Sequence, residues 1–430
     1  MLRKQFLLNS KESKKIDMKK VLSLLSAAVL LLSACTKDYV EESYTFFRPV
    51  YKTKDEVRAN IKNSNAEPLT APGKLFTKGN YVFLNDLNKG VHIIDYSNPA
   101  APKNIGFINI PGNVDLAVRG NYLYADCYTD LVTIDITNPA NVTLKGFIEG
   151  VFPHRAYDGY FRADSSKVIT SWVKVDTMVT SRYNNEGGNI FNRRTDVFFS
   201  NASGPTKSAS PNGMGGSMAR FALHNNRMYT VSYDDLKIFN TSNAALPSYI
   251  GKVDPGQGDI ETIYPYQDKL FIGSQTGMFI YSVANPDNPV KLGSSSHVRS
   301  CDPVIAENNY AYVTLKGGSA CGGFSNQLEV VDITNLLAPN RLKIYPMTSP
   351  TGLAKDGNNL LICDGNNGLV ILNATNPLAM FQQSKIENMI PYDVIAANGL
   401  ALVVAKDGLY FVGYQNPSAP TVLSKISTAN

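Results

Sequence analysis

The chain has 430 residues, 43% hydrophobic and 18% charged, with 41 Lys and Arg against 36 Asp and Glu. The first 34 residues hold seven of the basic and two of the acidic residues, so 41 minus 7 and 36 minus 2 leave 34 of each sign in the remainder. Because nucleic-acid binding needs clustered Lys and Arg opposite the phosphates, this neutral remainder excludes nucleic acid as an expected partner.

Residues 1–34 are predicted to be a signal peptide outside the folded protein. Met18-Lys19-Lys20 gives a charged start, and the apolar run 21–32 has 12 residues, fewer than the ~20 that a membrane-spanning helix needs. We infer that Met18 is the true start, because residues 1–17 add a polar, lysine-rich run that a signal peptide does not require.

The signal peptide ends in Leu32-Ser33-Ala34-Cys35, which resembles the lipobox of bacterial lipoproteins. The resemblance implies that Cys35 is acylated on sulfur and becomes the new N-terminus. Thr36 stands where a retention aspartate would keep such a protein in the inner membrane. We therefore expect a lipid anchor in the outer membrane, with the periplasmic or surface-facing orientation left open.

Residues 35–73 are predicted to form a lipidated tether and a short helix. Thr53-Lys54-Asp55-Glu56 matches a capping box, in which the Thr hydroxyl and the Glu carboxylate each bind a backbone N–H, so a helix is expected near 54–62. Pro68 and Pro72-Gly73 then end the leader before the first strand.

From residue 74 a unit of about 40 residues recurs. In residues 113–153, strands are expected at 115–119, 122–125, 131–136 and 143–148. Gly120-Asn121 separates the first two strands and Asn138-Pro139 follows the third. The same closing tag stands at Asn98-Pro99, Asn285-Pro286, Asn376-Pro377 and Asn416-Pro417, and in weaker form at Asn243 and Asn335. This period, with four short strands per unit, is typical of the blades of a β-propeller.

The predicted fold is therefore an all-β propeller over residues 74–427. Seven four-stranded units are visible, at 74–112, 113–153, 217–257, 258–298, 299–350, 351–391 and 392–427. One insertion, 154–216, interrupts them, and its strand-like run 167–173 leaves an eight-bladed ring as the alternative. We favour a lid or docking loop, because no turn tag closes a third strand there and 184–216 is poor in apolar residues.

The third strands resemble the LVIVD-repeat proteins, which are bacterial surface and secreted lipoproteins predicted to be propellers. The resemblance rests on residues 90–95 (GVHIID), 131–135 (LVTID) and 328–332 (LEVVD), whereas Tyr281-Ser282 and Val412-Gly413 depart from the acidic ending. It implies a fold and a location, but no catalytic residues.

One face of the disc is expected to carry function. The turns between second and third strands and the crossovers between blades emerge on the same side, which we call the crossover face. Both the insertion and the long loop 316–324 lie there. Functional residues are often found on loops held by a rigid scaffold.

Four cysteines remain after Cys35 is assigned to the lipid anchor. Cys301 and Cys321 belong to one blade and both reach the crossover face, so a disulfide between them is expected, closing a loop of ~20 residues and stabilising by ~3 kcal/mol. Cys127 and Cys363 are expected to be buried apolar residues.

Candidate ligand-binding residues gather at the predicted channel mouth. They are Asp259, Glu261, His297, Arg299 and Asp302, with Asp115 and Asp393 at equivalent strand starts. Their mixed charge suits a small polar or anionic ligand, whereas the plain alternative is that each acid caps a strand.

The sequence contains no esterase elbow, zinc helix, complete phosphate loop or Rossmann motif, so we predict no catalytic or metal-binding residue and no cofactor. The favoured function is a non-enzymatic, monomeric binding module for a protein or saccharide. The alternative is a hydrolase or lyase acting on a polar substrate at the channel mouth through His297 and nearby acids.

Overall fold

The computed structural model describes residues 19, 39–153, 155, 166–182, 214–256, 259–297, 303–318 and 324–429. The chain divides into two compact units, one comprising residues 50–171 and 199–430 and the other residues 1–49 and 172–198. Within the described ranges, no helix is both long and apolar enough to cross a lipid bilayer.

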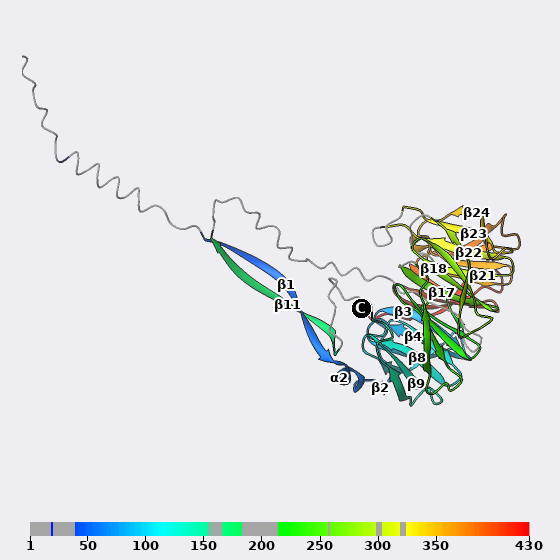
Figure 1. Cartoon of the computed structure of the whole chain (residues 1–430). Helices are drawn as coiled ribbons and strands as arrows, with labels where there is room; N and C mark the ends of the chain where they lie inside the picture. Colours follow the sequence, from blue (N-terminus) through cyan, green and yellow to red (C-terminus); the bar gives the residue numbers. More distant parts are fainter. Residues whose placement is uncertain are drawn as a thin grey trace, which may run out of the picture. The chain divides into compact units, whose positions relative to one another are not determined.

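The larger unit is a β-propeller with seven antiparallel blades, as predicted, and the eight-bladed alternative is wrong (Figure 1). The strands of blades 1 to 3 are β3 (Pro72–Lys78), β4 (Tyr81–Asp86), β5 (Gly90–Asp95) and β6 (Lys103–Asn109); β7 (Leu116–Arg119), β8 (Tyr122–Cys127), β9 (Asp130–Asp135) and β10 (Thr143–Ile148); β13 (Phe221–His224), β14 (Arg227–Val231), β15 (Leu236–Asn240) and β16 (Ser248–Val253).

Blades 4 to 7 continue the same order from the innermost to the outermost strand. They contain β17 (Ile260–Tyr266), β18 (Lys269–Ser274), β19 (Gly277–Ser282) and β20 (Val290–Ser296); β21 (Val304–Glu307), β22 (Tyr310–Leu315), β23 (Gln327–Asp332) and β24 (Asn340–Pro346); β25 (Leu353–Asp356), β26 (Asn359–Cys363), β27 (Leu369–Asn373) and β28 (Phe381–Ile386); β29 (Pro391–Ala397), β30 (Leu400–Ala405), β31 (Gly408–Gly413) and β32 (Thr421–Ser427). A short 3-10 turn, η3 (Gly365–Asn367), follows β26.

Burial explains why the middle strands are apolar at consecutive positions. Strand β8 is buried from Leu123 to Cys127, and β30 from Ala401 to Ala405. A strand in a blade is covered on both faces by the neighbouring blades, so alternation of polar and apolar residues is not required. The outer strands, such as β10 and β32, are mostly exposed or half-buried.

In most blades the turn tag accepts a hydrogen bond from the preceding blade. The carbonyl oxygen of Pro417 accepts a hydrogen bond of 2.6 Å from Ser384 Oγ on the preceding outer strand, and Pro377 accepts one of 2.8 Å from the Tyr345 hydroxyl. Tyr229 and Tyr124 bond the carbonyls of Pro286 and Ala244 in the same way. The tags, to which the sequence assigned only a turn, are thus also contacts between blades.

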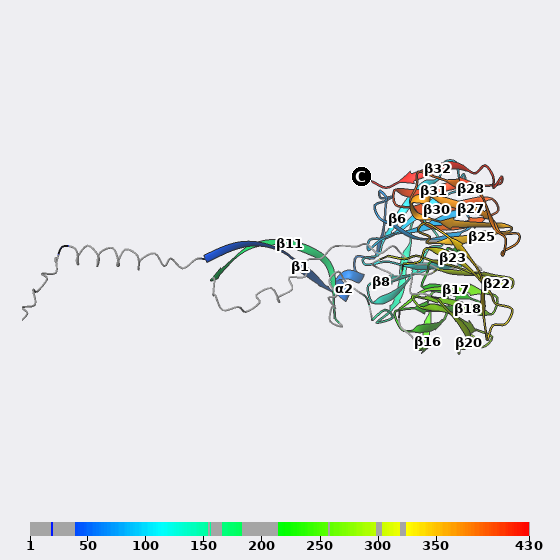
Figure 2. The same ribbon diagram turned by 90° about the horizontal axis from the view of Figure 1, so that it is seen from above.

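The ring closes between blades 7 and 1 without exchanging strands. Ser424 Oγ donates to the Pro99 carbonyl at 2.6 Å, and Leu69 forms a short parallel bridge with Thr428. Side chains of β3 to β5 and β29 to β31 share one apolar cluster. Figure 2 shows the propeller from above, with β30, β31 and β32 of the last blade labelled.

The leader contains the predicted helix, but the helix is shorter than expected. α2 (Lys54–Arg58) begins at Thr53, and its capping box with Glu56 is present. The chain then forms β2 (Lys62–Ser64), which pairs with the outer edge of blade 1. Lys62, the last residue of the predicted helix, thus belongs to this strand.

The smaller unit, in its described part, consists of parts of two long strands, β1 (Tyr39–Thr53) and β11 (Lys167–Arg182), which pair with each other (Figure 1). Thr45 Oγ1 donates to Asp176 Oδ1 at 2.5 Å within this unit. The strand-like run 167–173 of the insertion is therefore part of a strand, β11, but belongs to no blade. The sequence did not lead us to expect strand β1. Its aromatic and β-branched residues, Tyr44 to Tyr51, are the signal that predicts it.

Candidate functional site

The centre of the propeller is lined by one position that repeats in each blade. This position lies four residues before the end of the innermost strand, and its occupants are Lys74, Asp115, Arg220, Thr262, Pro303, Gly352 and Asp393. Charges therefore alternate over four successive blades, from Asp393 in blade 7 through Lys74 and Asp115 to Arg220 in blade 3. Lys74 Nζ lies 2.9 Å from Asp115 Oδ2, and both side chains are buried.

The last part of the insertion passes through this centre. β12 (Met214–Gly215) pairs with β3 of blade 1, and Ser217 Oγ accepts a hydrogen bond of 2.8 Å from the Leu353 amide in blade 6. The carbonyl of Ala219 accepts one from the Ile263 amide in blade 4. A segment of six residues that touches blades so far apart around the ring lies on its axis.

Small residues allow this passage. A Cβ atom on Gly216 would lie 2.7 Å from Asp393 Oδ1 and 2.9 Å from the Val394 carbonyl. Ser217 and Ala219 are also buried. The middle of the channel is thus occupied by the chain itself, which leaves only the channel mouths for the hydrolase or lyase considered above.

The buried charges hold this segment in place. The Arg220 amide donates to Asp115 Oδ2 at 2.8 Å, and Lys74 Nζ shares the same oxygen. Burial lowers the pKa of Lys74 to about 7, although Asp115 favours its charged form. Asp115 Oδ1 also accepts from the next backbone amide, as does Asp393 Oδ1, so both acids cap strand starts.

The predicted binding residues are only partly within the described ranges. Asp259 precedes β17 with φ of 64°, Glu261 Oε1 accepts a hydrogen bond of 3.0 Å from Gln275 Nε2, and the His297 amide donates to the Thr276 carbonyl. Arg299 and Asp302 lie outside the described residues. The proposed ligand site at this crossover therefore stays a prediction.

The five cysteines are also only partly within the described ranges. Cys127 and Cys363 are buried and unbridged, as expected, and burial raises the pKa of the Cys127 thiol to about 12. Cys35, Cys301 and Cys321 lie outside the described residues, so the lipid anchor and the disulfide also stay predictions.

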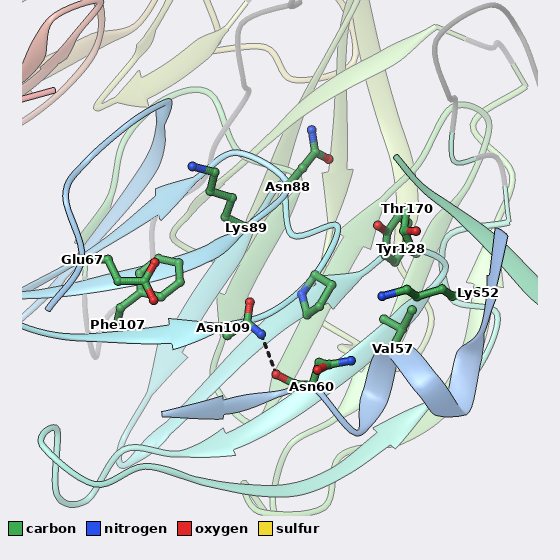
Figure 3. Close-up of a pocket in the computed structure, with 11 residues that line it drawn as sticks. Lys52, Val57, Asn60, Glu67, Asn88, Lys89, Phe107, Asn109, Tyr128 and Thr170 are labelled. Carbon is green, nitrogen blue, oxygen red and sulfur yellow. Dashed lines mark hydrogen bonds between the residues drawn. The ribbon is translucent and has the colours of Figure 1, made fainter. Parts of the chain in front are cut away.

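A pocket of ≈ 340 Å³ lies on the crossover face, over blades 1 and 2 (Figure 3). The loops of the two blades contribute Asn88, Lys89, Pro111 and Tyr128, and the outer strand of blade 1 contributes Phe107 and Asn109. The leader contributes Lys52, Val57, Asn60 and Glu67, and the insertion contributes Thr170. The residues of the insertion and of the leader thus meet on the face that the sequence indicates.

Ion pairs fix the leader wall of the pocket. Asp130, at the start of β9, accepts hydrogen bonds from Arg58 (2.6 Å) and Lys54 (3.0 Å) of α2. Burial acts to raise the pKa of Asp130, but the Gly150 amide, Arg58 and Lys54 outweigh it and lower the pKa. This carboxylate therefore stays charged at neutral pH and holds α2 against blade 2.

Asparagine side chains give the pocket its polarity. Asn109 Nδ2 donates to the Asn60 carbonyl at 2.7 Å, Asn60 Nδ2 donates to the Glu56 carbonyl, and Asn88 Oδ1 accepts from Arg155. Among the described residues, Asn60 Oδ1, Asn109 Oδ1 and Asn88 Nδ2 have no hydrogen-bond partner. Each side chain is held by one end and presents the other.

The floor of the pocket is apolar and its rim is polar. Val57, Phe107 and Tyr128 are buried, whereas Lys52 and Glu67 are exposed. No group of three or more His, Cys, Asp or Glu side chains in the described ranges is close enough to hold a metal ion. The pocket could not be found from sequence, because its walls come from residues up to 118 positions apart.

Three segments of the chain match the model of the LVIVD repeat, at residues 74–109, 112–149 and 299–346. They correspond to blades 1, 2 and 5. The predicted resemblance is confirmed: the chain carries LVIVD repeats and folds as a seven-bladed propeller. No curated protein gives a significant match.

Solved propellers are similar to the chain in fold. A protein from Lactobacillus plantarum has 12% identity and a TM-score of 0.52, covering 83% of this chain and 97% of its own. A chain of the Mitotic Checkpoint Complex has 9% identity and a TM-score of 0.50, covering 80% and 91%. PorZ, a surface component of the type-IX secretion system of Porphyromonas gingivalis, has 12% identity and a TM-score of 0.46, covering 84% and 39%. Identities this low bear on fold alone.

Proposed function

We propose that this protein is a lipid-anchored binding module of the outer membrane, in which the propeller presents the pocket over blades 1 and 2 to a ligand or partner without catalysing a reaction. The observation that carries the proposal is the composition of that pocket. Two segments outside the regular repeat, the leader and the insertion, both reach one place on the crossover face and line a cavity there. Ligand-binding sites are commonly built from loops that a rigid scaffold holds in place.

The leader supports a link between the anchor and the pocket. Cys35 is 17 residues before Lys52, the first residue of the pocket wall. α2 follows at once and is fixed to blade 2 through Asp130. A protein attached to lipid at Cys35 therefore carries its candidate binding site next to the tether in sequence.

The anchor is tested by Cys35→Ala. Several acyl chains hold a protein firmly, because each buried CH₂ contributes ~0.8 kcal/mol, so the variant is expected to move from the detergent phase to the aqueous phase. Unchanged partitioning of Cys35→Ala would remove the lipoprotein proposal.

The binding role is tested by filling the pocket. Lys52→Trp places a large side chain at the exposed rim, and Lys252→Trp makes the same change on the exposed outer strand β16 as a control. Co-purified molecules are identified by mass spectrometry for the wild type and both variants. Loss of a partner from Lys52→Trp alone supports the proposal, whereas identical partners in all three overturn it.

A further inference from the structure

We propose that one face of the β1–β11 ribbon lies on the lipid surface of the membrane and places Phe46, Val173 and Val175 in contact with lipid. The inference rests on the proposed function, because it takes the acyl anchor at Cys35 as its starting point. The face belongs to the smaller unit, whose described part comprises residues 39–49 of β1 and 172–182 of β11.

The described ribbon has no core of its own. β1 and β11 form a sheet of two strands (Figure 1), and none of the described side chains at 45–49 and 172–178 is buried. Its exposed large apolar side chains are Phe46, Phe47, Val173 and Met178. A lone two-stranded ribbon is only marginally stable in water, so a surface that covers its apolar side chains stabilises it.

Hydrogen bonds and ion pairs identify one face of the ribbon. Thr45 Oγ1 donates to Asp176 Oδ1, and Lys174 Nζ lies 3.3 Å from Asp176 Oδ2, so these three side chains share a face, which we call the Asp176 face. Side chains alternate between the two faces along a strand. The Asp176 face therefore also carries Phe47, Trp172 and Met178.

The opposite face carries no carboxylate among its described side chains. We call it the Phe46 face, and it consists of Phe46, Arg48, Val173, Val175 and Thr177. Contact with lipid removes water from a side chain, which is favourable for Phe and Val but costly for a carboxylate such as Asp176. The guanidinium of Arg48 suits the phosphate groups of lipids. The Phe46 face is therefore the one assigned to the membrane.

The position of the anchor favours lipid as the surface that covers this face. Cys35 precedes Tyr39, the first residue of β1, by four positions, which span at most ~14 Å in an extended chain. Phe46 follows seven positions later, ~23 Å further along the strand. Acyl chains on Cys35 thus hold the ribbon close to the headgroups, whereas a second copy or a protein partner has first to be met by diffusion.

The single tryptophan of the chain, Trp172, lies in the ribbon on the Asp176 face and serves as a reporter. Exchange of two neighbours, Trp172→Val with Val173→Trp, moves the reporter to the Phe46 face without a change in composition. Both lipidated proteins are reconstituted into phosphatidylcholine vesicles with and without bromine on the acyl chains, and tryptophan fluorescence is measured. Phosphatidylcholine has no net charge, so attraction of Arg48 to anionic lipid does not contribute.

We expect brominated lipid to quench the exchanged protein at least ~2-fold more strongly than the wild type, because the Phe46 face enters the boundary between headgroups and acyl chains. In the exchanged protein, Phe46→Ser is expected to lower the quenching and Phe47→Ser to leave it unchanged. These two residues are a matched pair, 42% and 40% exposed, on opposite faces. Neither is buried, so both variants should keep the melting temperature of the protein.

Flotation of the protein with the vesicles separates the possible failures. Flotation with absent quenching, or with equal quenching of the two reporters, overturns the ribbon contact and leaves the anchor intact. Cross-linking between copies in place of quenching assigns the face to a second copy and also overturns it. A protein that does not float with the vesicles has neither an anchor nor a ribbon contact, which overturns the proposed function as well.

Discussion

The ring of blades and the segments that interrupt it are held by different kinds of contact. In the ring, one contact is repeated: a residue at the bulge of an outer strand faces the turn tag of the next blade, as Ser384 and Ser424 do. The leader and the insertion make contacts that occur once, such as Asp130 with α2 and Ser217 with Leu353. The repeat therefore builds a rigid disc, while the irregular segments fill its centre and form its pocket.

The largest expected effect comes from removing one complete repeat. Deletion of residues 351–391 takes out blade 6 and exposes the apolar faces of blades 5 and 7, so we expect no cooperative folding. Circular dichroism during thermal melting measures this. A cooperative transition in the deletion variant would show that the ring can close with six blades.

A smaller effect is expected at a glycine where two blades approach closely. At the bulge position of β20, a Cβ atom on Gly293 would lie 2.2 Å from the Leu336 carbonyl of the next blade. Gly293→Ala is therefore expected to destabilise by about 1–3 kcal/mol, because backbone has to move. The same position in β16 is Gly251, which has no atom within 4 Å of its Cβ site.

Gly251→Ala is the matched control for this prediction. It is expected to leave the free energy of unfolding, obtained from the denaturant midpoint, within about 0.5 kcal/mol of the wild type. Equal midpoints for the two variants would contradict the view that blades are locked by contact at the turn tags.

The buried charges at the centre predict a dependence of stability on pH. The pKa of Lys74 is about 7 in the folded protein and close to its ordinary 10.5 when unfolded. Between pH 7 and 10.5 the unfolded chain therefore binds more protons than the folded chain, and the free energy of unfolding rises with pH, by at most ~1.4 kcal/mol per unit. Below pH 7 both states are protonated and this contribution no longer changes.

Lys74→Met tests the central charge directly. The rise in the free energy of unfolding between pH 7 and 8.5 should shrink in Lys74→Met and persist in Lys62→Met, which changes an exposed lysine of β2. A slope that is unaffected by Lys74→Met would assign the pH dependence to other groups.

The smallest effect on stability is expected from shortening the insertion. Deletion of residues 160–210 removes β11 but keeps residues 214–220, which fill the centre of the ring. We expect a cooperative melting transition close to that of the wild type and weaker binding at the pocket, because Thr170 is lost. Unfolding of this variant would show that the deleted residues support the ring.

Much of the regular fold follows from short stretches of sequence. In blade 2 the strands predicted at 115–119, 122–125, 131–136 and 143–148 agree with β7 to β10 to within two residues at each end. Turn chemistry and apolar runs are properties of neighbouring residues, so Asn138-Pro139 and the run 131–136 mark their own places. The burial of Cys127 and Cys363 follows for the same reason.

Patterns in the sequence thus predicted seven blades in chain order, with eight as the open alternative, and the face on which the insertion emerges. Only the tertiary structure decided that β12 pairs with β3, that β1 pairs with β11, and that Lys74 meets Asp115. These choices join residues 41 to more than 100 positions apart, and no local pattern selects one distant partner over another. The pocket depends on such choices, because it forms only where the leader and insertion meet blades 1 and 2.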